Sequence, residues 1–329
     1  MSWQGRQVLV TGAGGFIGSH LAEALVKAGA RTRAMVHYHA RGDAGHLDRL
    51  EPAVRQQIEV VAGDVIDAVL MHELVSGCDV VFHLAALIAI PYSYKAVGSY
   101  LAANVQGTYS VLEACRAQGV GRLVHTSTSE VYGTAQYVPI DERHPLNAQS
   151  PYAATKIAAD QLAGSYHAAY DLPVVTLRPF NNFGPRQSAR AVIPSIISQA
   201  LASGRVELGS LDPVRDFLYV GDTARGYLTA GEAEGVCGRV YNLGTGFGVS
   251  IGQVVELVGQ IMGRPLEVQG SAARRRPEAS EVQRLICSAQ RAADELGWRP
   301  EVSLKTGLER TVHWIDAHRE LYRPGQYAI

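Results

Sequence analysis

Two residues with acid–base side chains, Tyr152 and Lys156, lie four positions apart in the segment SPYAATK. On a helix this spacing places both side chains on one face, one turn apart. The helix start is well marked, because Ser150 is a favourable N-cap and Pro151 suits the first helical position. An ammonium group beside a phenol favours the phenolate, so the pair could transfer protons. The alternative is an exposed i,i+4 pair on an amphipathic helix, and features elsewhere in the chain argue against it.

A second candidate site is the glycine-rich segment GAGGFIG, which holds Gly12, Gly15 and Gly18. It follows the β-rich run Gln7–Thr11 and precedes apolar residues at helical spacing that end at Gly29. A strand, a glycine turn and a helix in this order let the backbone approach a pyrophosphate at the positive helix end. The spacing is GxxGxxG rather than GxGxxG, and the alternative is merely a tight turn. We expect a nicotinamide dinucleotide to bind here.

Short apolar runs alternate with helical segments along the first half of the chain. After the first strand, further strands are expected at 32–36, 58–62, 80–84, 122–127 and 174–177, and long helices at 98–118 and 151–170. This alternation predicts an α/β fold, a Rossmann-type doubly wound parallel sheet with helices on both faces. In such sheets ligands bind at the C-terminal ends of the strands.

Residues at these strand ends are candidates for cofactor contacts. NAD-selective sites usually carry an acid after the second strand, but His37–Arg41 contains none, and Arg41 or a histidine could meet a 2′-phosphate. We therefore expect a tightly bound NAD(P), with NADP favoured, unless this stretch is a solvated loop. Asp64 could bond the adenine amine, and the small Ala85 and Ala86 permit close approach. The expected cofactor-binding residues are Gly12, Gly15, Phe16, Ile17, Gly18, His37, Arg41, Asp64, Val65, Leu84, Ala85, Ala86, Thr126, Tyr152 and Lys156.

The composition changes after Arg178, where turn-forming residues become frequent. Helices are expected at 191–203, 251–262, 290–296 and 304–318, and a β-like run at 214–219. We expect residues 1–178 to form the dinucleotide-binding domain, which also receives 217–244, and residues 179–329 to form a smaller, interleaved substrate domain. The expected substrate-binding residues are Thr128, Asn181, Arg186, Val192, Arg215 and Arg276. The arginines suit a diphosphate, although each alone could be a surface cation.

Composition excludes several classes of function. The chain has 329 residues and a net charge of -1, which argues against a nucleic-acid or membrane-surface binder. Its four cysteines lack metal-ligand spacing, so we expect reduced thiols and no metal site. No apolar stretch is long enough to span a membrane, and the opening residues MSWQGRQ lack a signal-peptide core. We expect a cytoplasmic protein.

Nearly the whole chain resembles the extended short-chain dehydrogenases/reductases that act on nucleotide sugars. The resemblance is carried by GAGGFIG, HLAA at 83–86, STSEVYG at 127–133, YAATK at 152–156, RPFNNFGP at 178–185, RDFLYVGD at 215–222 and LGW at 296–298. Within this group the chain most resembles nucleotide-sugar 4,6-dehydratases. GDP-mannose dehydratases and the dehydratases of legionaminic-acid pathways share the triplet Thr128-Ser129-Glu130. Simple 4-epimerases generally lack a glutamate at the position of Glu130, whereas UDP-glucuronate decarboxylases share the triplet and are the main alternative, with 4-epimerases next.

The resemblance also implies a mechanism on a GDP- or UDP-linked hexose, N-acetylated or not. Tyr152 as phenolate takes the proton of the 4-hydroxyl, Lys156 lowers the tyrosine pKa and binds the nicotinamide ribose, and Thr128 bonds O4. Hydride passes from C4 to the nicotinamide, and Glu130 then removes the acidified C5 proton. The 6-hydroxyl leaves as water, protonated by Glu130 or by a group near Ser129, and the hydride returns to C6. The dTDP-glucose dehydratases usually have an aspartic acid where Ser129 stands, and serine is a poor general acid.

Two alternative hypotheses are non-catalytic, one for Glu130 and one for the whole protein. Glu130 could be a structural carboxylate that caps the following turn, and the protein could be a non-catalytic NADP sensor on the same fold. The presence of Tyr152, Lys156 and the three glycines argues against the sensor. The resemblance further implies at least a homodimer, joined through the helices at 98–118 and 151–170.

Overall fold

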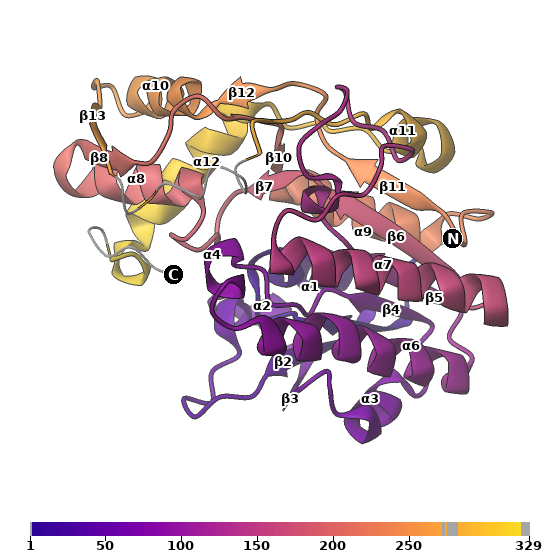
Figure 1. Ribbon diagram of the computed structural model, residues 1–329. Coiled ribbons are helices and arrows are strands. Elements are labelled where there is room, and N and C mark those ends of the chain that lie inside the picture. The colour runs from indigo at the N-terminus through magenta and orange to yellow at the C-terminus, as the bar shows by residue number, and fades with distance from the viewer. Residues whose placement is uncertain (1, 272–273, 275–281, 324–329) are drawn as a thin grey trace.

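A seven-stranded parallel sheet forms the centre of the molecule (Figure 1). The computed structural model describes residues 2–271, 274 and 282–323. The strand order is β11-β6-β5-β4-β1-β2-β3, and every neighbouring pair is parallel. The strands are β1 (Gln7–Thr11), β2 (Arg31–His37), β3 (Ile58–Gly63), β4 (Val80–His83), β5 (Arg122–Thr126), β6 (Val174–Pro179) and β11 (Val240–Leu243). The doubly wound sheet is confirmed, and the six expected strands lie within two residues of their predicted bounds.

Helices cover both faces of this sheet. One face packs against α3 (Ala68–Val75), α6 (Gly107–Gln118) and α7 (Pro151–Tyr170), and the other against α1 (Phe16–Lys27), α9 (Val220–Glu232) and α11 (Gln290–Leu296). Because helices cover both faces, the central strand β1 is buried on both sides. Val8, Leu9 and Val10 are all fully buried, Leu9 in one core and its two neighbours in the other. A strand that is buried on both faces is therefore a continuous apolar run.

The helix expected over 98–118 is interrupted. It consists of α5 (Val97–Tyr100), a π-helical segment η2 (Leu101–Gln106) and α6. Asn104, in the π-helical segment, is fully buried and exchanges hydrogen bonds of 2.8 and 3.0 Å with the backbone of Leu87. Its amide also donates to the hydroxyl of Thr155 on α7, at 3.0 Å. Asn104 of the π-helical segment thus connects the loop after β4 to α7, the helix that carries Tyr152, through these hydrogen bonds.

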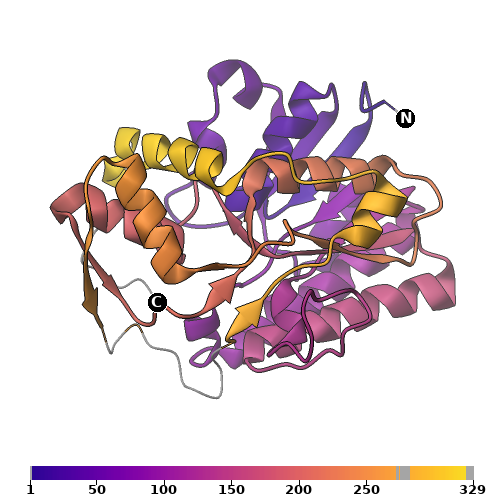
Figure 2. The same ribbon diagram turned by 90° about the horizontal axis from the view of Figure 1, so that it is seen from above.

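A smaller lobe lies beside the sheet. Its helices α8 (Val192–Ser203), α10 (Ile251–Ile261) and α12 (Leu304–Ala317) share a core of their own. Figure 2 shows the yellow α12 and the orange α10 gathered with α8 at one side of the molecule. The short strands pair as β7 (Asn181–Phe183) with β10 (Phe217–Tyr219), β8 (Arg205–Leu208) with β13 (Glu267–Gly270), and β9 (Val214–Arg215) with β12 (Val249–Ser250) and β14 (Arg284–Leu285). Further short helices in the described part of the chain are η1 (Gly45–Arg49), α2 (Pro52–Arg55), α4 (Ile90–Ser93), η3 (Ser129–Tyr132) and η6 (Arg319–Leu321).

Helix α9 is the main element that the sequence did not predict. Glycine disfavours helix formation, and α9 contains Gly221, Gly226 and Gly231. The packing explains two of them. A Cβ on Gly226 would lie 2.8 Å from a Leu243 methyl, and one on Gly231 would lie 2.7 Å from the Trp3 ring. The close packing of α9 against the rest of the fold therefore outweighs the low helix propensity of its glycines.

Three further properties concern the described residues as a whole. None of their helices combines the length and the apolar character that a membrane span requires. They contain no cluster of three or more histidine, cysteine, aspartate or glutamate side chains suited to a metal ion. All four cysteines are free thiols.

Candidate active site

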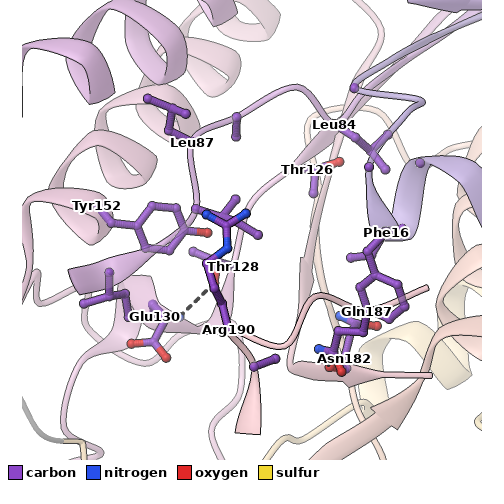
Figure 3. A pocket seen from close by; sticks show the side chains of 18 of the residues that line it. Phe16, Leu84, Leu87, Thr126, Thr128, Glu130, Tyr152, Asn182, Gln187 and Arg190 are labelled. Carbon is purple, nitrogen blue, oxygen red and sulfur yellow. Dashed lines mark hydrogen bonds between the residues drawn. The ribbon is translucent and has the colours of Figure 1, made fainter. Parts of the chain in front are cut away.

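A cavity of about 1090 Å³ opens at the C-terminal ends of the parallel strands, where ligands bind in doubly wound folds. Its walls come from the glycine turn after β1, the ends of β2 to β6, α7 and the smaller lobe. Figure 3 shows Tyr152, Thr128 and Glu130 gathered at one end of the cavity and Phe16 and Leu84 at the other. Both lobes therefore contribute to a single site.

Most of the expected site residues line this cavity. They are Gly12, Gly15, Phe16, Ile17, Gly18, His37, Asp64, Val65, Leu84, Ala85, Ala86, Thr126, Thr128, Ser129, Glu130, Tyr152, Lys156, Asn181, Val192 and Arg215. Arg41 and Arg186 are not among the lining residues, and Arg276 lies outside the described residues.

The glycine turn presents bare backbone to the cavity. Gly12 has a positive φ of 69°, and a Cβ there would lie 2.8 Å from the backbone of Ala85. A Cβ on Gly18 would lie 2.3 Å from the carbonyl oxygen of Gly12. Gly15 begins α1 without any side-chain cap, so the first amides of the helix are left for another partner. This cradle fits the pyrophosphate of a dinucleotide.

Arg41, in the loop after β2, was expected to contact the cofactor but does not line the cavity. The Arg41 side chain is 85% exposed and lies outside the cavity, with its Nε 3.7 Å from the Asp43 carboxylate. Asp43 itself lines the cavity together with His37 and His39, and His39 Nε2 lies 3.1 Å from its Oδ1. The carboxylate of Asp43 therefore lies at the cavity wall near the end of β2, although Asp43 follows the last residue of that strand, His37, by six positions.

Tyr152 and Lys156 are buried, at 7% and 3% exposure, so the interpretation as an exposed surface pair is wrong. The expected helix cap is confirmed, because Ser150 Oγ accepts a hydrogen bond of 3.1 Å from the amide of Ala153. Lys156 Nζ donates to the carbonyl oxygen of Thr126 at 2.6 Å. The strand end β5 and helix α7 are thereby joined at the centre of the cavity wall.

The electrostatics of this pair differ from the expectation. Burial raises the pKa of Tyr152 well above its usual value, contact with the Thr128 hydroxyl lowers it, and the charge of Glu130 raises it further. Burial lowers the pKa of Lys156 to about 8, and the nearby Asp160 acts in the opposite direction. The pKa of Tyr152 is therefore raised overall and not lowered as expected, because desolvation of the phenolate dominates.

The triplet begins the short helix η3. Thr128, not Glu130, is its cap, since Thr128 Oγ1 accepts a hydrogen bond of 3.2 Å from the amide of Glu130. Ser129 is 3% exposed, and the half-buried Glu130 lies in the cavity near Tyr152 (Figure 3). Within the described part of the chain, no residue forms a hydrogen bond or ion pair with the Glu130 carboxylate. A half-buried base without a structural partner is available for chemistry.

Four of the six expected substrate-binding residues line the cavity, and Arg186 does not. Arg215 lines it, as does Asn181, whose buried Nδ2 has no hydrogen-bond partner within the described residues. Arg186 has a positive φ of 68° and turns its guanidinium towards helix α1. There it contacts His20 Nδ1 at 2.9 Å and pairs with the carboxylate of Glu23. The backbone turn at Arg186 thus directs this cation away from the cavity.

The sequence interpretation missed other polar residues at the cavity. Arg190, Gln187 and Asn182 line it from the segment after β6, and Arg274 lines it from the smaller lobe. In Figure 3, Arg190 points across the cavity towards Thr128 and Tyr152. The segment GPRQSARAVIP was a visible signal, but an irregular loop has no periodicity that says which of its two arginines turns inwards.

Comparison with known proteins agrees with this geometry. A sequence profile of the family described as GDP-mannose 4,6 dehydratase matches residues 9–311. A dTDP-glucose 4,6-dehydratase from Actinoplanes sp. is 34% identical over 95% of this chain and 98% of its own. A UDP-glucose 4-epimerase from Mycolicibacterium smegmatis is also 34% identical, over 94% of this chain and 98% of its own.

Solved structures give the same result. DesIV, a dTDP-glucose 4,6-dehydratase from Streptomyces venezuelae with NAD and TYD bound, superposes with a TM-score of 0.85 at 31% identity. The match covers 97% of this chain and 99% of that one. Motifs, fold, cavity and near-complete coverage agree, and the chain belongs to the GDP-mannose 4,6-dehydratase family, within the extended short-chain dehydrogenases/reductases.

Proposed function

We propose that this protein is a nucleotide-sugar 4,6-dehydratase, which converts an NDP-hexose to its 4-keto-6-deoxy derivative. The observation that carries this proposal is the Glu130 carboxylate. It stands in the cavity beside Tyr152 with no partner in the described structure, as a base for the C5 proton requires. A simple epimerase moves hydride at C4 and needs no second base.

A nicotinamide dinucleotide supplies the hydride acceptor for C4 and the hydride donor for C6. The bare glycine turn at Gly12–Gly18 is proposed to hold its pyrophosphate, and Asp64 its adenosine. Tyr152, Lys156 and Thr126 lie where the strand ends meet α7 and are proposed to face the nicotinamide half. Residues 1–178 with 217–244 are proposed as the cofactor-binding unit, and the rest as the sugar-nucleotide unit.

The chain's own residues divide the chemistry between them. Tyr152 accepts the proton of the 4-hydroxyl, and Thr128, which already contacts its phenol, positions O4. Lys156, when charged, stabilises the phenolate. Glu130 then removes the C5 proton, which the C4 ketone has made acidic, and the 6-hydroxyl leaves as water. Ser129 is buried against this point, and it is proposed to orient the leaving group rather than to protonate it.

The sugar nucleotide is proposed to enter between the lobes. Asn181 Nδ2 offers a buried donor without a partner in the described residues, and Arg215 lines the same region, with Val192 beside it. A diphosphate suits these groups, because guanidinium–phosphate contacts are charge-assisted and geometrically matched. Arg186 keeps its structural pairing with α1 in this arrangement.

One observation supports a second candidate, a UDP-glucuronate decarboxylase or an epimerase for a uronic acid. Arg190 points towards Thr128 and Tyr152, where C4 to C6 of the sugar would lie (Figure 3). A cation at this place suits a C6 carboxylate as well as a C6 hydroxyl. The shared C4 oxidation would then be followed by loss of carbon dioxide instead of water.

The choice between NAD and NADP is proposed to depend on the loop after β2. Its basic residues favour a 2′-phosphate, whereas the Asp43 carboxylate repels one and accepts from a free ribose hydroxyl. Because Asp43 lines the cavity and Arg41 does not, we favour NAD over the NADP suggested by the strand end. Fluorescence titration of wild type and Asp43→Asn with both cofactors tests this, and an unchanged preference for either cofactor in the variant would contradict it.

The test of the main proposal is incubation with GDP-mannose, UDP-GlcNAc, GDP-GlcNAc, dTDP-glucose and UDP-glucuronate, followed by mass spectrometry. Loss of water identifies a dehydratase, loss of carbon dioxide a decarboxylase, and no mass change with altered stereochemistry an epimerase. We further propose a cytoplasmic homodimer, because the four cysteines are free and because α6 and α7 carry exposed Tyr109 and Tyr170.

A further inference from the structure

Asp160 continues the row of side chains formed by Tyr152 and Lys156. The three residues are spaced four apart on α7, so they share one face of the helix. Asp160 is 6% exposed and is not among the cavity-lining residues. A buried carboxylate one turn behind an active-site lysine needs an explanation, because burying a charge is costly unless it is paired.

The partners of Asp160 come from the strands whose ends build the site. Arg178 on β6 donates to Asp160 Oδ2 from Nε at 3.1 Å and lies 3.0 Å from it through Nη2. The Ser127 hydroxyl, just after β5, donates to the same oxygen at 2.7 Å. His125 on β5 lies 3.2 Å from Oδ1 through its Nε2. One carboxylate thus ties α7 to two neighbouring strands.

The charges around Lys156 show what this carboxylate does for the site. Burial lowers the pKa of Lys156 to about 8, and Asp160 is the nearby charge that raises it. His83 on β4 and His125 on β5 also lie close, and burial lowers the pKa of both, so they add no charge near neutral pH. The other ionisable groups around this row are Tyr152 on α7, Tyr100 on α5, Glu130 on η3, Arg178 on β6 and Tyr227 on α9.

We propose that Asp160 is a positioning residue of the active site, which keeps Lys156 charged and holds α7 in register with β5 and β6. The consequence for catalysis rests on the proposed function, in which a charged Lys156 stabilises the Tyr152 phenolate. The effect on Lys156 itself does not depend on that function.

The sign of the effect follows from the charges. Removing the negative charge of Asp160 lowers the pKa of Lys156, so the amine loses its proton at a lower pH. It also lowers the pKa of Tyr152, because Asp160 disfavours the phenolate. Because the pKa of Lys156 lies below that of Tyr152, the two limbs of a pH–rate profile report the coupled pair rather than one residue each, and both of these pKa values fall when the Asp160 charge is removed. Both limbs should therefore move to lower pH together.

The direct test is a lysine titration of the cofactor-free protein by NMR. The sequence has four lysines, Lys27, Lys95, Lys156 and Lys305, so ¹³Cε-labelled lysine gives few resonances, and Lys156→Arg identifies the one of interest. In Asp160→Asn we expect the titration midpoint of Lys156 to fall by about one pH unit or more. A folded variant with an unchanged midpoint would overturn the proposal.

Two further variants separate charge from packing. Tyr132→Phe keeps every charge but removes the hydroxyl that links Arg178 to Asn242, at 2.9 and 2.7 Å, and it should leave the Lys156 midpoint unchanged. If Asp160→Asn does not fold, Asp160→Asn/Arg178→Gln removes both members of the buried pair, and it should still lower the midpoint. A shift in Tyr132→Phe equal to that in the Asp160 variant would refute the role of the charge.

The catalytic consequence is measured separately, as the pH dependence of substrate-driven cofactor reduction. Both limbs should shift to lower pH in Asp160→Asn and stay in place in Tyr132→Phe. If wild type reduces its cofactor with none of the five sugar nucleotides, the proposed function fails while the lysine titration still decides the role of Asp160. If wild type reacts and the variant keeps both limbs, the proposal about Asp160 fails alone.

Discussion

Replacing Glu130 with Gln should separate the two halves of the proposed reaction. The carboxylate has no hydrogen-bond or ion-pair partner within the described residues, so its loss should change the free energy of unfolding by less than about 0.5 kcal/mol. The amide keeps the shape but is not basic. A positioned general base contributes roughly a hundred- to ten-thousand-fold in rate, or about 3 to 5.5 kcal/mol of barrier.

Oxidation at C4 should survive this substitution. The Glu130 charge raises the pKa of Tyr152, so its removal makes the phenolate easier to form. The variant should therefore oxidise C4 at a rate equal to or above that of wild type at acidic pH, and then stop. Reduced cofactor should accumulate on the enzyme when substrate is added.

The assay follows nicotinamide absorbance and the mass of the sugar nucleotide in the same sample. Glu142→Gln is the matched control, because it removes a buried carboxylate that lies outside the cavity and accepts a hydrogen bond from the backbone amide of Asn242. It should cost stability and leave water elimination intact. Dehydration by Glu130→Gln at near wild-type rate would show that Glu130 is not the base, and the dehydratase proposal would lose its main support.

Four further outcomes are expected. Tyr152→Phe should fold but lose roughly a hundred- to ten-thousand-fold of C4 oxidation, and stopped-flow absorbance that finds only a few-fold loss would refute its role. Gly18→Ala places a methyl 2.3 Å from the Gly12 carbonyl oxygen, so cofactor affinity measured by fluorescence titration should fall at least about tenfold. Ser129→Ala should keep dehydration within about tenfold of wild type, and a larger loss by mass spectrometry would contradict a role limited to orienting the leaving group. Light scattering at micromolar concentration should find at least a dimer, and a monomer would contradict an interface on α6 and α7.

Much of the fold was predictable because the local strand propensity of the sheet residues agrees with their burial in the folded protein. In β1, the run from Val8 to Val10 is apolar on both faces, so strand, parallel pairing and helical cover all follow from one pattern. The helix of Tyr152 was equally clear, because Ser150 and Pro151 mark its first turn. These elements need no information from distant residues.

The parts that were missed depend on distant contacts. Helix α9 forms despite its glycines, because Gly226 and Gly231 pack where a side chain would collide with the rest of the fold. The two arginines of the segment after β6 illustrate the same limit. Arg186 turns towards Glu23 on α1 and Arg190 towards the cavity, and only the tertiary structure distinguishes them.

Elimination of water needs an acid that protonates the leaving 6-hydroxyl, and the candidates in the triplet are Glu130 and Ser129. The triplet supplies one carboxylate, Glu130, because Ser129 replaces the aspartic acid usual in dTDP-glucose dehydratases. A buried serine hydroxyl is far too weak an acid to protonate a leaving hydroxyl. In the proposed reaction, however, Glu130 becomes a carboxylic acid once it has taken the C5 proton, and C6 is the neighbouring carbon of the sugar. We infer that one residue removes the C5 proton and protonates the 6-hydroxyl, which requires both groups to leave from the face of the sugar that Glu130 contacts.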